Sequence, residues 1–132
     1  MIIDSSALVA ILRAEPEQVA FARVIARAGG GRLSAASYLE TAIVIDRARD
    51  PVTSRALDTF LAANGIEIEA VSAAQARIAR DAYRDFGKGS GHAARLNFGD
   101  CLTYALAKEK GEPVLFKGED FSQTDLEAAG PR

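Results

Sequence analysis

Four acidic residues lie far apart in the sequence but share one kind of position. Each comes at the end of an apolar segment or in the first turn of an expected helix: Asp4, Glu40, Asp100 and Asp120. Asp4 follows Met1–Ile3 and Asp120 closes the segment 114–120, so both are expected at the carboxyl ends of short buried strands. Ligands bind at that edge of an open parallel sheet. We therefore predict one metal-binding site made from the four acids.

Carboxylates gathered in one place repel one another unless a cation lies between them. Two like charges ~4 Å apart cost about 1 kcal/mol in water and about 4 kcal/mol at an effective dielectric near 20. Mg²⁺ or Mn²⁺ would neutralise such a site through carboxylate and water oxygens. With only His92 and Cys101 available, a zinc site or a serine-histidine-acid triad is not favoured.

Three of the acids also have a purely structural interpretation. The segments Ser37–Glu40 and Asn97–Asp100 both have the spacing of a helix cap and its third helical residue, where the helix end stabilises a carboxylate. Asp120 alone could be a solvated loop residue. Asp4 is harder to explain in this way, because burying a carboxylate against a strand end costs free energy unless a cation meets it.

The elements that would position these acids alternate between strand and helix. Alternating strands and helices imply right-handed parallel crossovers, and hence an α/β fold: a three-layer α/β/α sandwich with a short central parallel sheet. Hydroxyl groups of Ser5 and Ser6 are expected to cap the first helix, and Ser72 with Gln75 has capping-box spacing. Strands are expected at 1–3, 32–34, 66–71 and 114–116, and helices over 7–12, 16–28, 39–45, 51–63, 72–86 and 97–110.

Length and composition fit one soluble domain. The 132 residues are enough for a single domain over 1–132, and a hydrophobic fraction of 48% contains no run near the ~18 residues that a membrane span needs. Asp4 lies where a signal peptide would be basic, so secretion is not expected. Cys101 has no partner for an internal disulfide and falls in an apolar helical pattern, which predicts a core residue and fits a reducing cytoplasm.

A formal net charge of −2 does not by itself favour a nucleic-acid partner. The acidity is local if the four acids bind metal, because the rest of the chain is then slightly basic. Seven basic side chains lie near the expected site edge, and they either contact RNA or form an ordinary solvated surface: Arg13, Arg47, Arg49, Lys88, His92, Arg95 and Lys117. Aromatic residues make up only 7% of the chain, which favours recognition of RNA shape and backbone over base stacking.

Four blocks of the sequence resemble the signature blocks of PIN-domain ribonucleases, and most of all those of the VapC toxins of bacterial type II toxin-antitoxin pairs. The blocks cover nearly the whole chain in order: Met1–Leu12, Ser37–Glu40, Leu96–Cys101 and Leu115–Phe121. The resemblance implies an Mg²⁺- or Mn²⁺-dependent endoribonuclease that is a homodimer and is held inactive by a VapB-type antitoxin. An antitoxin segment would cover apolar helix surface near Leu8, Ile11, Val19 and Val24.

The resemblance also implies roles for individual residues. Asp4, Glu40, Asp100 and Asp120 match the acidic quartet of the family, while Ser6 and Asn97 match its polar supporting positions. Glu119 could compete for the fourth role, but Asp120 is preferred because it fits the Gly-x-Asp-Phe block. A first metal would be held by Asp4 and Asp100, with Glu40 bound directly or through water. Asp120 would serve a second metal or orient the attacking water, giving 5′-phosphate and 3′-hydroxyl ends.

Two other function classes remain open at this point. A receiver-type signalling domain also binds Mg²⁺ at strand ends, but it needs a pair of acids after the first strand, where this chain has only Asp4. A PIN fold kept solely as a protein-binding module is the second alternative, and the complete acidic quartet argues against it. The identity of the cleaved RNA is not encoded in any recognisable feature.

Overall fold

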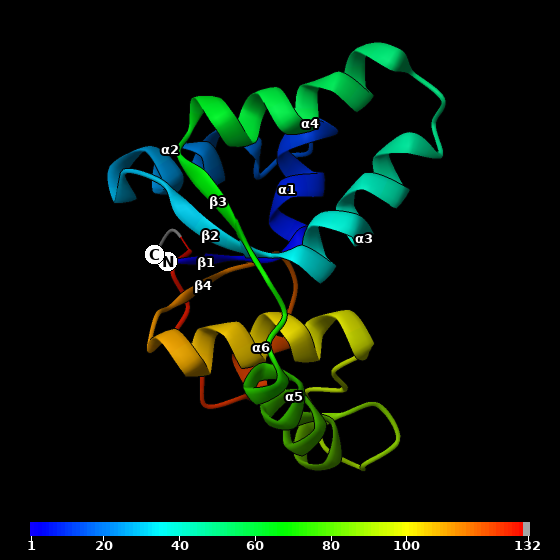
Figure 1. Ribbon diagram of the computed structural model, residues 1–132, viewed down its shortest axis with the longest axis vertical. Coiled ribbons are helices and arrows are strands. Elements are labelled where there is room, and N and C mark those ends of the chain that lie inside the picture. The colour runs from blue at the N-terminus through cyan, green and yellow to red at the C-terminus, as the bar shows by residue number, and fades with distance from the viewer. Residues whose placement is uncertain (131–132) are drawn as a thin grey trace.

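In the computed structural model, which describes residues 1–130, a four-stranded parallel sheet lies between two layers of helices (Figure 1). The strand order is β3-β2-β1-β4, and each neighbouring pair is parallel. The expected three-layer α/β/α architecture is therefore confirmed. The elements are β1 (Ile2–Ile3), α1 (Ser5–Leu12), α2 (Gln18–Ala28), β2 (Gly31–Ser34), α3 (Ala35–Asp46), α4 (Pro51–Ala63), β3 (Ile66–Glu69), α5 (Ala73–Phe86), α6 (Phe98–Lys110), β4 (Val114–Leu115) and the 3₁₀ turn η1 (Phe121–Gln123).

Neighbouring residues of the adjacent strands β1 and β4 face opposite layers. Ile3 and Leu115 pack into the core formed with α1, α2 and α4, whereas Ile2 and Val114 pack against α6. All four side chains are fully buried. Continuous apolar runs of this kind are typical of parallel strands that are covered on both faces. Strands β1 and β4 therefore hold the residues that follow them, including Asp4, at a fixed edge of the sheet.

The outer strand β3 differs from its prediction. It ends at Glu69 rather than at Val71, and although Ile66 is buried, Ile68 is 47% exposed. A regular alternation would have placed both isoleucines in the core. Because β3 is an edge strand of the sheet, its second apolar side chain reaches the surface instead.

The second helical layer consists of α6 against the sheet and α5 packed on α6 (Figure 1). Cys101 of α6 is 3% exposed within this layer, and burial raises the pKa of its thiol to about 11. The expectation of a core cysteine is confirmed. Among residues 1–130 there is no helix with both the length and the apolar character to cross a membrane.

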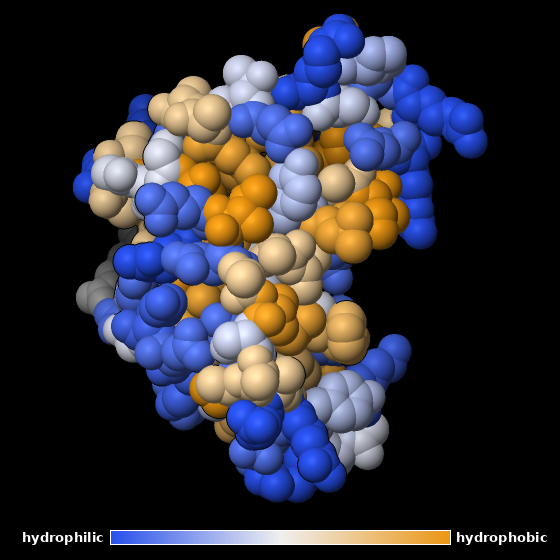
Figure 2. Space-filling model, in the orientation of Figure 1, coloured by the Kyte–Doolittle hydropathy of each residue, from blue (hydrophilic) through white to orange (hydrophobic). Residues whose placement is uncertain are grey.

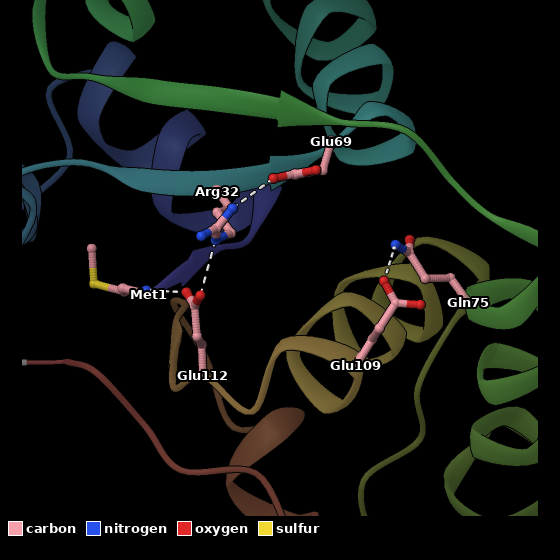
Figure 3. A network of polar contacts seen from close by, with 6 residues as sticks. All are labelled: Met1, Arg32, Glu69, Gln75, Glu109 and Glu112. Carbon is pink, nitrogen blue, oxygen red and sulfur yellow. Dashed lines mark hydrogen bonds and ion pairs between the residues drawn. The ribbon is translucent and has the colours of Figure 1, made fainter.

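The predicted cap of α5 is half confirmed. The Ser72 hydroxyl accepts a hydrogen bond from the Gln75 backbone N–H at 3.1 Å. The Gln75 side chain, however, donates to Glu109 at 3.0 Å and does not complete a capping box (Figure 3). A tertiary contact to α6 has replaced the local one.

An ion-pair network connects the strands on one side of the sheet (Figure 3). Arg32 of β2 donates to Glu69 of β3 at 2.8 Å and to Glu112 at 2.9 Å, and Glu112 also binds the N-terminal amine of Met1. These contacts link β3, β2 and β1 to the turn that precedes β4. They help to fix the register of strands that are only two to four residues long.

Candidate active site

Asp4 lies directly after β1 and is 2% exposed. Its Oδ2 accepts hydrogen bonds from the Ser6 backbone N–H at 3.0 Å and from the Ser6 hydroxyl at 2.7 Å, which makes Asp4 the N-cap of α1. The prediction that the hydroxyls of Ser5 and Ser6 cap this helix is therefore wrong. The carboxylate after the strand takes the position because its oxygen reaches the second free N–H of the helix.

Asp4 Oδ1 is held from the opposite helical layer. Thr103 of α6 donates its hydroxyl to this oxygen at 2.7 Å, and the Ser37 hydroxyl lies 3.0 Å from that of Thr103. Sequence reasoning did not identify Thr103. The available signal was its spacing, since it follows Asp100 by three residues and so lies on the same face of α6.

Asp100 and Asn97 form the predicted capping box at the start of α6. The Asp100 backbone N–H donates to Asn97 Oδ1 at 2.9 Å, and the Asn97 N–H donates to Asp100 Oδ2 at 3.0 Å. This structural role does not exclude a chemical one. Burial raises the pKa of Asp100 to about 7, with further increases from Asp4, Asp120 and Glu40, against the lowering effect of the Asn97 hydrogen bond.

The pKa of Asp100 thus indicates that all four predicted acids lie close enough to interact. Glu40 lies within α3, whose N-cap is Ser34, with its hydroxyl 3.3 Å from the Ala36 N–H. The predicted cap at Ser37 is therefore wrong, because Ser37 is a buried residue inside the helix. Capping does not explain Glu40.

The Glu40 carboxylate is directed toward the start of α6. It accepts a hydrogen bond from the Ser5 hydroxyl, and its Oε2 lies so close to Gly99 that a Cβ at that position would overlap it. The absence of a side chain at Gly99, which directly precedes Asp100, therefore allows the Glu40 carboxylate to approach the start of α6. Neither Ser5 nor Gly99 was predicted as a site residue.

Asp120 is not at the end of a strand, contrary to its prediction. Strand β4 ends at Leu115, and Asp120 follows in an exposed turn that leads into η1. Asp120 nevertheless contributes to the raised pKa of Asp100, whereas Glu119 does not. Glu119 instead accepts a long 3.4 Å hydrogen bond from Ser122. This difference supports Asp120 over Glu119 as the fourth acid.

The donor set fits a hard divalent cation. It consists of carboxylates and hydroxyls, and no ion pair within residues 1–130 involves any of the four acids. As the side chains stand in the described part of the chain, no three Asp, Glu, His or Cys residues are already arranged around a metal position. Glu40 would have to exchange its contact with Ser5 for a metal. The acids that would hold the ion are Asp4 and Asp100, with Glu40 and Asp120 beside them.

The basic residues that were predicted near the site follow several different elements of the chain. Arg13 and Arg47 follow α1 and α3, and Arg49 lies just beyond. The remaining candidates come from the loop after α5 and the segment after β4: Lys88, His92, Arg95 and Lys117. His92 uses its Nδ1 to accept the Ala94 N–H at 3.0 Å, and it packs edge-on against Phe86. Contact of these side chains with RNA stays a prediction.

A shallow pocket of about 460 Å³ opens beside Glu40. Its walls combine the start of α1, the middle of α3 and the segment after β4. The lining residues are Ser5, Ser6, Val9, Glu15, Glu40, Val44, Lys117 and Gly118.

Comparison with known proteins gives a consistent result. The family model described as "PIN domain" matches residues 1–127. Ribonuclease VapC28 of Mycobacterium tuberculosis is 56% identical over 129 residues, covering 98% of this chain and 97% of the relative. Ribonuclease VapC42 of the same species is 47% identical over 129 residues, with 98% of each chain covered.

Solved structures show the same fold at low sequence identity. Mycobacterium tuberculosis VapC20, described as a sarcin-ricin loop cleaving toxin, superposes with a TM-score of 0.74 and 19% identity over 98% of both chains. A toxin-antitoxin complex from Klebsiella pneumoniae gives a TM-score of 0.68 and 14% identity, covering 92% of this chain and 89% of that one.

Proposed function

Since this chain belongs to the PIN domain family, with VapC ribonucleases among its full-length relatives, we propose that it is an Mg²⁺- or Mn²⁺-dependent endoribonuclease toxin. The observation that carries the proposal is the convergence of Asp4, Glu40 and Asp100 at the start of α6. Thr103 of this helix binds Asp4 Oδ1, and Glu40 Oε2 approaches Gly99 next to Asp100. The raised pKa of Asp100, caused by burial and by the charges of Asp4, Asp120 and Glu40, agrees with this arrangement. A protein gains nothing for its stability by assembling such a site, but a divalent cation would be bound there strongly.

The proposed reaction is hydrolysis of an RNA phosphodiester bond. Asp4 and Asp100 would hold the metal, because they are the most buried of the four acids. Glu40 would bind it directly or through water, and Asp120 would orient the attacking water or serve a second ion. A bound divalent cation supplies the activation of water and the neutralisation of charge on the phosphate and the leaving oxygen.

Ser6 and Asn97 would act as positioning residues. Ser6 holds Asp4 Oδ2 through both its hydroxyl and its backbone N–H, and Asn97 holds Asp100 through the reciprocal cap. Both contacts orient a carboxylate without adding charge. Groups of this kind commonly change metal affinity or activity by about 10- to 100-fold when they are removed.

The partner would be a VapB-type antitoxin. Of the four residues near which cover was expected, Leu8 and Ile11 are already buried in the core and Val24 is partly buried against it, so the expectation is wrong for Leu8 and Ile11. Val19 is 57% exposed and borders an open groove of about 850 Å³ between α2 and α4. We assign the antitoxin segment to this groove.

Apolar surface also supports a homodimer. Figure 2 shows apolar residues over β3 and α3 on the visible face, and Leu39 and Ile43 of α3 are 58% and 46% exposed on either side of Glu40. Phe98, beside Asn97, is 79% exposed. Side chains of this size at the rim of the site are candidates for contact with a second copy of the chain.

A single experiment separates this proposal from the two alternatives. Purified protein is incubated with RNA and Mg²⁺, with and without EDTA, and in parallel with acetyl phosphate. An endoribonuclease cuts RNA only when metal is present. Phosphorylation by acetyl phosphate would reveal a receiver domain, and no reaction of a folded protein with either reagent would indicate a binding module.

Toxin activity has its own test. Expression of the wild-type chain should arrest growth, and co-expression with the product of an adjacent small gene should restore growth and yield a co-purifying complex. Normal growth at a verified soluble level of the wild-type chain would refute the toxin assignment.

A further inference from the structure

Lys117 is tied to the acidic site through its backbone. Its N–H donates to the Ser6 hydroxyl oxygen at 3.0 Å, and the same hydroxyl donates to Asp4 Oδ2 at 2.7 Å. The Ser6 side chain therefore connects the Lys117 backbone to Asp4, the most buried of the four acids. Of the residues that line the pocket beside Glu40, only Lys117 carries a positive charge.

The Lys117 ammonium does not interact with the acidic site itself. Its Nζ lies 2.8 Å from Glu15 Oε2 and 3.2 Å from Glu17 Oε2, and the three side chains are 38%, 30% and 35% exposed. The carboxylates of Glu15 first and Glu17 second raise the pKa of Lys117, so the side chain is charged at neutral pH. Only Glu15 accepts a hydrogen bond from the ammonium within residues 1–130. Two carboxylates thus share one ammonium at the rim of the pocket.

The two glutamates lie on a well-fixed connection between α1 and α2. The Glu15 N–H donates to Ala10 O at 2.9 Å, the Gln18 N–H donates to Glu15 O at 2.9 Å, and the Gln18 side chain donates to Ile11 O at 2.9 Å. The lysine has a long, flexible stem, so it is the mobile member of the group. All three side chains are partly exposed, so solvent screens these ion pairs and the ammonium can exchange its partners.

We infer that Lys117 contacts a phosphate of the RNA substrate and that Glu15 and Glu17 hold it in a resting position until RNA arrives. This inference rests on the proposed ribonuclease function and adds a substrate-contacting residue to it. A phosphate entering the pocket replaces the two carboxylates as the partner of the ammonium. The glutamates then act against RNA binding, because they compete for the lysine and repel the phosphate.

The inference predicts that removing the charge of Lys117 weakens RNA binding, whereas removing the charges of Glu15 and Glu17 strengthens it. Affinity for a fluorescent single-stranded RNA is measured by anisotropy between about 50 and 200 mM KCl. Ca²⁺ replaces Mg²⁺ in the binding assay to limit cleavage, and cleavage rates are measured separately with Mg²⁺. Lys117→Gln should weaken RNA binding by about 3- to 10-fold at low salt and reduce the salt slope by about 0.7, the value for one lost phosphate contact on a single strand.

Two further variants and a control complete the design. Lys117→Arg should restore the salt slope, and the double variant Glu15→Gln with Glu17→Gln should tighten binding by about 3- to 10-fold. Lys108 of α6 is the matched control, because it is an exposed lysine in a 2.8 Å ion pair with Asp125. Lys108→Gln should leave both affinity and slope unchanged. Thermal unfolding of each variant confirms that it is folded.

The outcomes separate this inference from the ribonuclease assignment. If Lys117 has only a structural role, Lys117→Gln and the double glutamine variant lose the same contacts, shift affinity in the same direction and keep the wild-type salt slope. If the wild-type protein cuts RNA, a shift of both variants in the same direction overturns this inference but not the ribonuclease assignment. An unchanged salt slope in Lys117→Gln has the same consequence. A folded wild-type protein that neither binds nor cuts RNA overturns the proposed function, and this inference falls with it.

Discussion

Asp100→Asn should stabilise the metal-free protein at neutral pH. Folding raises the pKa of this carboxyl from its ordinary value of 3.8 to about 7. The folded state therefore binds the proton more tightly than the unfolded state does. Ionisation of Asp100 opposes folding, and the stability of the metal-free wild type should fall as the pH rises through the window between those two values. Asparagine has no charge to lose and keeps an oxygen that can accept the Asn97 N–H.

The size of the effect follows from the pKa change. At about 1.36 kcal/mol per pKa unit, the upper limit is about 4 kcal/mol at pH 8. Part of the site meets solvent, and screening reduces the expected gain to about 1–2 kcal/mol. The advantage of the variant should shrink to less than half as the pH falls from about 8 to about 5, and it should vanish only below the ordinary value of 3.8, where Asp100 is protonated in both the folded and the unfolded state.

The assay is urea unfolding of both proteins in EDTA at several pH values between about 5 and 8. Glu119→Gln is the matched control, because it removes a carboxylate from an exposed neighbouring turn. Adding Mg²⁺ should then stabilise the wild type but not Asp100→Asn, since only the wild type retains the full ligand set. A variant that is less stable than the wild type at pH 8 in EDTA would show that Asp100 serves the helix cap alone, and the argument for a metal site would lose its main support.

Four further outcomes are expected. Asp4→Asn should reduce RNA cleavage by at least about 100-fold while the protein stays folded, as judged by circular dichroism; near-normal cleavage would remove Asp4 from the site. Asp120→Asn should impair cleavage more than Glu119→Gln does in the same assay, and the reverse order would reassign the fourth acid. Gly99→Ala should lower cleavage by about 10- to 100-fold because its Cβ displaces Glu40, yet thermal unfolding should show no loss of stability. His92→Ala should cut RNA at nearly the wild-type rate and only with metal; activity that persists in EDTA and disappears in His92→Ala would identify a histidine ribonuclease instead.

Sequence reasoning succeeded where the controlling interactions are local. The Asn97–Asp100 cap, the Ser72 cap and the apolar strands β1 and β4 depend on residues within a few positions of one another, and all are present. The order of strands and helices followed from the same short-range patterns. A buried Cys101 was predictable for the same reason.

The failures have a different physical origin. Ser34, not Ser37, caps α3, and the Ser37 hydroxyl lies inside the fold against Thr103, 66 residues away. The contact between Thr103 and Asp4 spans 99 residues and has no pattern along the chain. The Gln75 side chain likewise donates to Glu109, 34 residues away, and not to the N-terminus of its own helix. Contacts between elements that lie far apart in the sequence decide these choices, and they appear only once the helices are placed around the sheet.

The hydrogen bonds that hold the acids share one chemical property. Asp4 is bound by Ser6 and Thr103, Glu40 by Ser5, and Asp100 by the Asn97 backbone, so every donor is electrically neutral. Neutral donors fix the direction of a carboxylate but leave its charge uncompensated. The nearby cation that could have compensated it, Lys117, is bound by Glu15 and Glu17 instead. The fold therefore orients a concentrated negative charge and leaves its neutralisation to species from outside the chain, which is what a site for divalent metal and RNA phosphate requires.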